Sequence, residues 1–183
     1  MQRTAYYKNF PDETPSAAAQ PAKFRDIQAD PKIQIFCNRP RSVTSNPITL
    51  LHPIFGQFYD DSKNFKADPE ISSFVQALTV MMADFYDDEA QRALSFRKLI
   101  YDHFKIKLEA AYVATTPYTT DGHASIGFHV YLNSEAKNEA GSTPADSYIQ
   151  SAIYYHYHIR PFASSMLGSR FPCIHIYYFG KVF

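Results

Sequence analysis

The chain has 183 residues, of which 45% are hydrophobic and 20% charged, so it can bury a core, and global disorder is excluded. Its 18 basic and 18 acidic residues cancel to a formal net charge of +0 at pH 7, which excludes attraction of nucleic acid by a large overall positive field; any phosphate-binding surface must be local. Two cysteines, Cys37 and Cys173, are too few for a disulfide framework, and no apolar run is long enough to span a bilayer, so we expect a soluble, intracellular protein without a membrane partner.

The N-terminal part of the chain differs in composition from the rest. Residues 1–46 hold many of the prolines and a run of small residues, and such a stretch sustains neither helical nor strand periodicity for long. We therefore expect a loosely ordered, Pro-rich N-terminal arm over residues 1–46. Residues 47–183 are expected to form the folded domain.

From residue 47 the apolar spacing becomes helical. The cluster Ile54, Phe55 and Phe58 predicts a short helix. Asp68-Pro69-Glu70 is a helix-start signal, with Asp as the N-cap and Pro at the first helical position. A second acidic start, Asp87-Asp88-Glu89, opens another helix, which is expected to reach Phe104.

Beyond residue 107 the period falls towards two. This pattern predicts a strand over 111–116, a turn or strand end over 119–122 and a longer strand over 126–137. A loop over 138–145 is followed by a helix that starts at 146 or 147 and stops before Pro161, and by an apolar strand over 173–179. The order predicts a mixed α/β (α+β) domain with a central β-sheet flanked by helices.

The most informative residues are Asp121, Glu135, Ala136 and Lys137. Glu135 and Lys137 are two residues apart on a strand, so their side chains leave the same face. A hairpin between residues 121 and 135 would bring the two carboxylates together, and carboxylates that close repel unless a cation lies between them. We therefore expect a Mg²⁺ (or Mn²⁺) site made by Asp121, Glu135 and the Ala136 carbonyl. Lys137 would place a positive charge beside the attacking water or the phosphorus.

This spacing resembles the PD-(D/E)xK nuclease superfamily, and Gln150 with Tyr154 is similar to the Q-x-x-x-Y helix motif of its RecB-like branch. The block His52-Pro53-Ile54-Phe55-Gly56, the run Lys137-Asn138-Glu139-Ala140-Gly141 and the closing strand are similar to the nuclease-like domain of fungal crinkler-type, kinase-linked proteins. This resemblance covers residues 50–183. The sequence departs from the family pattern in two ways. Pro117 lies four residues before Asp121, so the literal Pro-Asp pair is absent, and Asn133 and Ser134 make the strand end more polar than the usual apolar run.

The resemblance implies a restriction-endonuclease-like core and a nuclease that hydrolyses DNA, as a module of a larger fungal effector-like protein that acts in the nucleus or in a host cell. Asp121, Glu135 and Lys137 would be the catalytic residues, and Gln150 and Tyr154 would position the nucleic-acid backbone. The superfamily often adds a Glu from its first core helix. Glu89 is the leading candidate for this further metal ligand, with Glu70 and Glu109 behind it.

Blander interpretations stay open, as does the oligomeric state. The fold could be a catalytically inactive module that binds nucleic acid or protein, or a structural domain whose partner follows it in a longer polypeptide. His156 and His158 would lie about 200° apart on a helix, so a zinc site there is disfavoured. His129 shares the strand face of Glu135 but is expected to be packed or solvated, and the tyrosines at 148, 154, 155 and 157 pack more often than they stack on bases.

Overall fold

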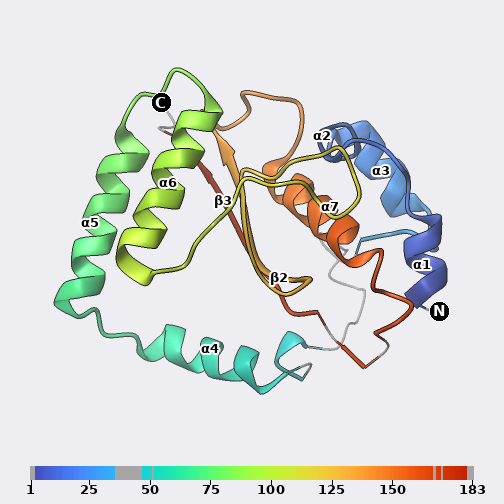
Figure 1. The fold of residues 1–183 in the computed structure, drawn as a ribbon, viewed down its shortest axis with the longest axis horizontal. Helices are drawn as coiled ribbons and strands as arrows, with labels where there is room; N and C mark the ends of the chain where they lie inside the picture. The colour runs from blue at the N-terminus through green and yellow to red at the C-terminus, as the bar shows by residue number, and fades with distance from the viewer. Residues whose placement is uncertain (1–2, 36–46, 51, 167, 170, 181–183) are drawn as a thin grey trace.

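A computed structural model describes residues 3–35, 47–50, 52–166, 168–169 and 171–180. Over these residues the fold is mixed α+β, as predicted, with a small three-stranded sheet flanked by helices (Figure 1). The helices are α1 (Arg3–Asn9), α2 (Pro15–Ala18), α3 (Pro21–Ala29), α4 (Pro53–Asn64), α5 (Pro69–Ala83), α6 (Glu89–Phe104) and α7 (Ser147–Ile159), with a 3₁₀ turn at Ile48–Leu50. The strands are β1 (Gly122–Ile126), β2 (His129–Lys137) and β3 (Ile174–Phe179).

The sheet has the order β1-β2-β3, with β1 antiparallel and β3 parallel to β2. The expected strand over 126–137 is wrong at its start. Gly127, at a φ of 60°, lies in a turn that ends β1 and begins β2, because glycine adopts this left-handed conformation without steric penalty. The expected strand over 111–116 is also absent: Ala114 has a φ of 48°, and the one bridge within this segment, from Tyr112 to Thr119, is isolated.

The helices form two layers, one on each face of the sheet. In Figure 1, α5 and α6 lie on one side of the strands, and α7 lies on the other with α1–α3 outside it. The predicted helix starts are confirmed, since the side chains of Asp68, Asp88 and Asp146 each accept a hydrogen bond from a backbone N–H of the first turn. Phe96 of α6 stacks on Tyr178 of β3 with 4.1 Å between ring centroids, so one core lies under α6.

The N-terminal segment is not loosely ordered over the residues that the structure describes. Pro15 and Pro21 stand at the start of α2 and α3, where a missing N–H and a fixed φ favour the helix instead of breaking it. The segment is buried against α7: a second core joins Phe10 and Ile27 to Ile153 and other side chains. The boundary expected at residue 46 and Cys37 lie outside the described residues.

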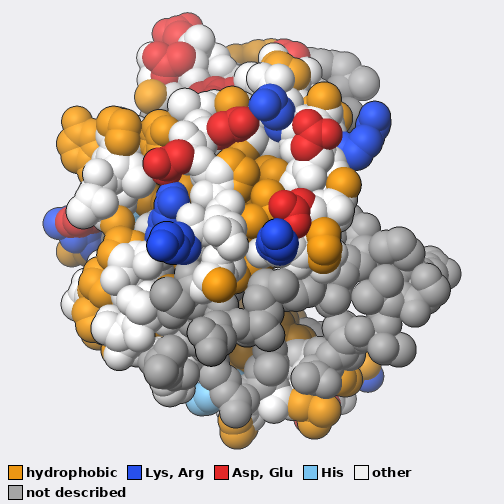
Figure 2. Space-filling view, turned by 90° about the vertical axis from the view of Figure 1, so that its right-hand side faces the viewer, with side chains coloured by type: hydrophobic (Ala, Val, Ile, Leu, Met, Phe, Trp, Pro, Cys, Tyr) orange, Lys and Arg blue, Asp and Glu red, His pale blue; other side chains and the backbone are white. Residues whose placement is uncertain are grey.

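The surface on the side of the N-terminal helices carries both positive and negative charges (Figure 2). Acidic and basic side chains lie interspersed in Figure 2, with apolar side chains between them. Some pair directly: Lys23 with Glu13 at 3.0 Å, and Arg160 with Asp12 at 2.8 Å. No helix among the described residues combines the length and the apolar character needed to cross a membrane.

Gly180, directly after β3, packs closely against α6 and the end of β2. Its replacement by alanine is expected to lower the free energy of unfolding by about 1–3 kcal/mol. An added Cβ would lie 2.4 Å from Arg92 Nη2 and 2.4 Å from the Asn138 carbonyl oxygen. Gly56→Ala is the matched control, since nothing lies within 4 Å of its Cβ position and alanine favours helix. Urea denaturation of both variants tests this, and equal midpoints would contradict it.

Candidate active site

The hairpin of β1 and β2 brings Asp121 to the tip of β2. Gly122 pairs with Ser134, so Asp121 lies just beyond the paired region, beside residues 135–137. Its Oδ2 atom accepts a hydrogen bond from the backbone N–H of Ala136 at 2.8 Å. Arg97 of α6 donates to the Asp121 carbonyl, which holds this turn against the helix.

The Ala136 carbonyl points to the same edge of β2 as this hydrogen bond. The N–H and C=O of one strand residue share an edge, and the next residue uses the opposite edge. The Lys137 carbonyl accordingly accepts from Gly180 N at 3.3 Å on the β3 side. The Ala136 carbonyl therefore faces the edge on which Asp121 lies, where it adds a neutral oxygen to the two carboxylates.

Lys137 connects two acidic residues from different layers. Its Nζ atom lies 3.0 Å from Glu135 Oε1 and 3.1 Å from Glu89 Oε2. Burial lowers the pKa of Lys137, but the charges and hydrogen bonds of the two glutamates outweigh this and raise it. The amine is therefore a buried cation at the site, with 7% of the residue exposed.

The three glutamates proposed as a further metal ligand lie in different places in the structure. Glu89, in the first turn of α6, reaches Lys137 and thus the strand tip. Glu109 instead pairs with Lys107 at 2.6 Å on the surface, and Glu70 is exposed in the first turn of α5. Of the three, the structure brings Glu89 to Lys137.

Glu135 carries the most perturbed carboxyl group of the site. It is 1% exposed, and its Oε2 atom has no hydrogen-bond partner. Burial and the nearby negative charge of Asp121 raise the pKa of Glu135 to about 8, although Lys137 opposes this. Burial likewise raises the pKa of Asp121. Two carboxylates are therefore held close together in a poorly solvated place, which is unfavourable unless a cation or a proton neutralises them.

These oxygens fit a hard divalent cation. Mg²⁺ prefers oxygen ligands and commonly takes one or two carboxylates while keeping several waters. Asp121, Glu135 and the Ala136 carbonyl supply such a partial set, and the unpartnered Glu135 Oε2 atom is available to it. No cluster of three or more His, Cys, Asp or Glu side chains suited to a metal occurs among the described residues, so water would complete the coordination.

Gln150 and Tyr154 of α7 lie one helical turn apart and are both buried. Burial, followed by the charge of Glu135, raises the pKa of Tyr154, while a hydrogen bond with the Gln150 side chain opposes the shift. The Tyr154 hydroxyl is therefore close enough to Glu135 to sense its charge. Gln150 Oε1 has no hydrogen-bond partner, so it is a second unsatisfied acceptor in this buried layer.

The polar residues near the end of β2 have structural partners. Asn133 Nδ2 donates to the Ser151 backbone carbonyl at 3.1 Å and to Ser151 Oγ at 3.0 Å, which ties β2 to α7. Ser151 Oγ also lies 2.9 Å from His175 Nδ1 of β3. Ser134 Oγ donates to the Gly122 carbonyl at 2.9 Å and fixes the hairpin. The polar strand end therefore positions the site.

Two arginines of α6, Arg92 and Arg97, support the site although the sequence does not single them out. Arg97 holds the Asp121 turn. Arg92, which is buried, donates to Asn138 Oδ1 at 3.2 Å and to the backbone carbonyls of Met82 and Asp84 at the end of α5. The available signal was their spacing. Arg92 lies three residues after Glu89 and four before the apolar Phe96, so the three share one side of the helix, and a charged residue that is buried there needs a partner.

The other candidate residues lie away from this site. His129 Nε2 is 2.9 Å from the Pro172 carbonyl, at the opposite end of β2. His156 stacks on Phe10 and His158 lies against His123, with 4.7 Å and 4.8 Å between ring centroids. The two histidines of the zinc alternative therefore pack in different surroundings.

Comparison with known proteins gave no match: no protein-family model, no curated protein and no solved structure is significantly similar to this chain. The function is therefore inferred from the residues at the tips of β1 and β2 and from their surroundings.

Proposed function

We propose that the chain is a Mg²⁺-dependent nuclease of the PD-(D/E)xK kind, which hydrolyses phosphodiester bonds of DNA. The observation that carries this proposal is the convergence of Asp121, Glu135, the Ala136 backbone and Lys137 at one strand tip, with Glu135 Oε2 buried and unpartnered. The order α6, bridged segment, β1, β2, α7, β3 supports a restriction-endonuclease-like core. The domain would serve as the nuclease module of a larger protein.

Each group would have a separate task in hydrolysis. Asp121, Glu135 and the Ala136 carbonyl would hold the cation, which supplies Lewis-acid polarisation of the phosphate and a more acidic bound water. Lys137, already held beside Glu135, would orient the attacking water and stabilise the negative charge that develops on the phosphate oxygens. The water oxygen would form a bond to phosphorus while the bond to the leaving deoxyribose oxygen breaks; the water would lose one proton to solvent, and the leaving oxygen would gain one from solvent. Gln150 and Tyr154 would keep Glu135 in place and help to position the backbone.

Lys137→Ala tests this mechanism against the principal alternative, a nuclease-like fold that only binds. Labelled single-stranded and duplex DNA are incubated with Mg²⁺ or Mn²⁺, and binding is measured in Ca²⁺ to suppress turnover. We expect wild-type cleavage to fall about a hundredfold or more in Lys137→Ala while binding stays within a few fold, because the lost charge acts on the transition state.

The alternative rests on the Lys137 ion pairs, which also make sense as a purely structural link between α6 and β2. It predicts DNA or protein binding without cleavage under either metal, in wild type and variant alike. Lys98→Ala is the matched control, since Lys98 pairs with Asp102 on the exposed side of α6. Its cleavage rate should equal that of the wild type.

A further inference from the structure

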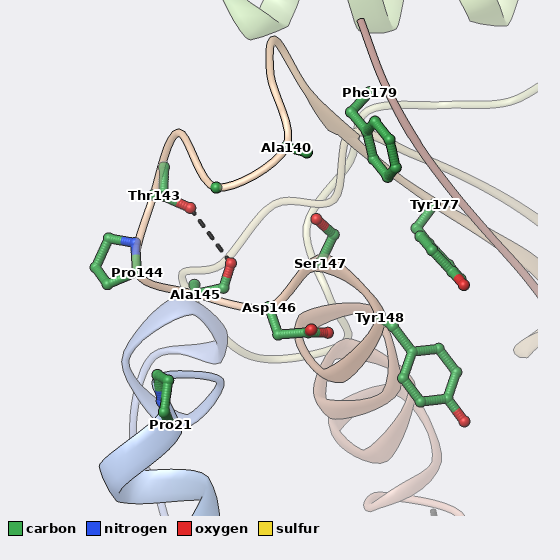
Figure 3. Close-up of a pocket in the computed structure, with 11 residues that line it drawn as sticks. Pro21, Ala140, Thr143, Pro144, Ala145, Asp146, Ser147, Tyr148, Tyr177 and Phe179 are labelled. Carbon is green, nitrogen blue, oxygen red and sulfur yellow. Dashed lines mark hydrogen bonds between the residues drawn. The ribbon is translucent and has the colours of Figure 1, made fainter. Parts of the chain in front are cut away.

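A cavity of about 630 Å³ lies between the loop that follows β2, the start of α7 and the end of β3. Figure 3 shows the rings of Tyr148, Tyr177 and Phe179 on one side and Thr143 and Pro144 on the loop opposite. This volume lies within the range of about 300–1,000 Å³ that is typical of small-ligand pockets. Neither the proposed metal ligands nor Lys137 line it.

The cavity adjoins the candidate active site across a single strand spacing. Tyr177 is the β3 partner of Glu135, and Phe179 is the partner of Lys137. Residues in register on neighbouring strands project from the same face, about 4.8 Å apart. The aromatic side of the cavity therefore lies directly beside the residues that would act on the phosphate, on the same face of the sheet.

The lining suits a flat, uncharged ring better than a phosphate group. It contains no Lys or Arg, and its one charged side chain, Asp146, caps α7 by accepting from Ile149 N at 3.0 Å. Tyr148 and Tyr177 are 37% and 48% exposed, with 5.7 Å between their ring centroids. Aromatic faces of this kind stack on nucleobases with little sequence preference.

We propose that this cavity receives one unpaired nucleobase next to the phosphate being cleaved. The preferred substrate is then single-stranded DNA, or a duplex with a frayed end or a flipped-out base. The inference rests on the proposed nuclease function and narrows its substrate class. A base inside a duplex is stacked and paired and must leave the helix before it can enter such a cavity. The catalytic carboxylates and Lys137 would then lie at the phosphate that joins this nucleotide to the next.

The first test compares Tyr177→Ala with Tyr177→Phe. Binding of a fluorescein-labelled single-stranded oligonucleotide of about 12 nucleotides is followed by anisotropy in Ca²⁺, beside a duplex of the same sequence. We expect Tyr177→Ala to bind the single strand about tenfold more weakly than the wild type, and Tyr177→Phe to bind it nearly as well as the wild type. The affinity for the duplex should be the same in both variants. Tyr112→Ala is the control, because Tyr112 is an exposed aromatic residue outside the cavity lining.

Photocrosslinking gives a readout that does not depend on turnover. A single-stranded oligonucleotide that carries 5-iodouracil should crosslink to the peptide that contains Tyr148 or Tyr177. Crosslinks elsewhere, equal affinity in Tyr177→Ala, or capture of a proline-rich peptide but no oligonucleotide by the cavity would overturn the inference. Metal-dependent cleavage that needs Glu135 would still stand after that failure. Crosslinking at Tyr177 without any cleavage would instead remove the nuclease function and leave the base-binding cavity.

Discussion

Replacing Glu135 by glutamine is expected to lower the rate of Mg²⁺-dependent DNA cleavage by about a thousandfold or more. Glutamine keeps the shape of the side chain but cannot supply the charge that holds the cation, and loss of a metal-held transition state removes several kcal/mol, at about 1.4 kcal/mol per factor of ten. The rate is measured under single-turnover conditions, so that product release does not mask the chemical step.

Glu109→Gln is the matched control, since Glu109 is also a glutamate paired with a lysine but lies on the surface. It should cleave at the wild-type rate. Calorimetry with Mn²⁺ gives a second readout: the wild type should bind the ion, and Asp121→Asn should not. Equal cleavage by wild type and Glu135→Gln would remove the proposed roles of both carboxylates.

Acidification from pH 6.5 to 4 is expected to lower the free energy of unfolding by several kcal/mol, on the order of 3 kcal/mol for each of three buried histidines before an opposing contribution from Glu135. Burial lowers the pKa of His156, His158 and His175 from 6.5 to about 4 in each case. Between pH 6.5 and 4 these histidines take up protons in the unfolded chain but not in the folded one, so their contribution to stability is full above pH 6.5 and is lost as the pH drops. The pKa of Glu135, raised to about 8, acts in the opposite sense and offsets part of this loss, because the folded chain holds that proton more tightly. At about pH 4 each histidine would cost on the order of 3 kcal/mol, so the three together outweigh the single offset from Glu135.

His156→Phe should weaken this pH dependence. The ring stacks on Phe10, and its Nδ1 atom is buried without a partner, so a phenyl ring can occupy the same place without an unsatisfied polar atom. Between about pH 7.5 and pH 5 the variant should lose about 2 kcal/mol less stability than the wild type, as measured by urea denaturation at both values. Parallel curves for the two proteins would show that His156 does not titrate in this range.

The sequence predicts the site better than it predicts the frame around it. Asp121 and the residues at 135–137 converge because a hairpin requires only local spacing and strand alternation, both of which are visible in the chain. The strand ends, in contrast, depend on Gly127 and Ala114, whose positive φ values interrupt an otherwise favourable pattern. A single sequence shows apolar alternation but not which residue leaves the extended conformation.

Long-range partners were the least predictable part. Glu89 was a candidate ligand, yet its contact with Lys137 spans 48 residues of sequence, and nothing local fixes it. The prolines of the N-terminal segment were interpreted as interruptions because their neighbours in the sequence give no helical face of their own. Pro15 and Pro21 start helices that are stabilised by packing on α7, and tertiary packing overrides weak local propensity.

The packing of the N-terminal helices on α7 has a consequence for any shortened version of this chain. The Tyr157 hydroxyl donates to the Pro11 carbonyl at 3.0 Å, across 146 residues of sequence. A shortened chain that starts at residue 47 would expose Ile153 and its neighbours to water and would leave this hydroxyl without the Pro11 carbonyl. A shortened chain that keeps this core must therefore include the opening helices, because the helix that carries Gln150 and Tyr154 lies between them and the sheet (Figure 1).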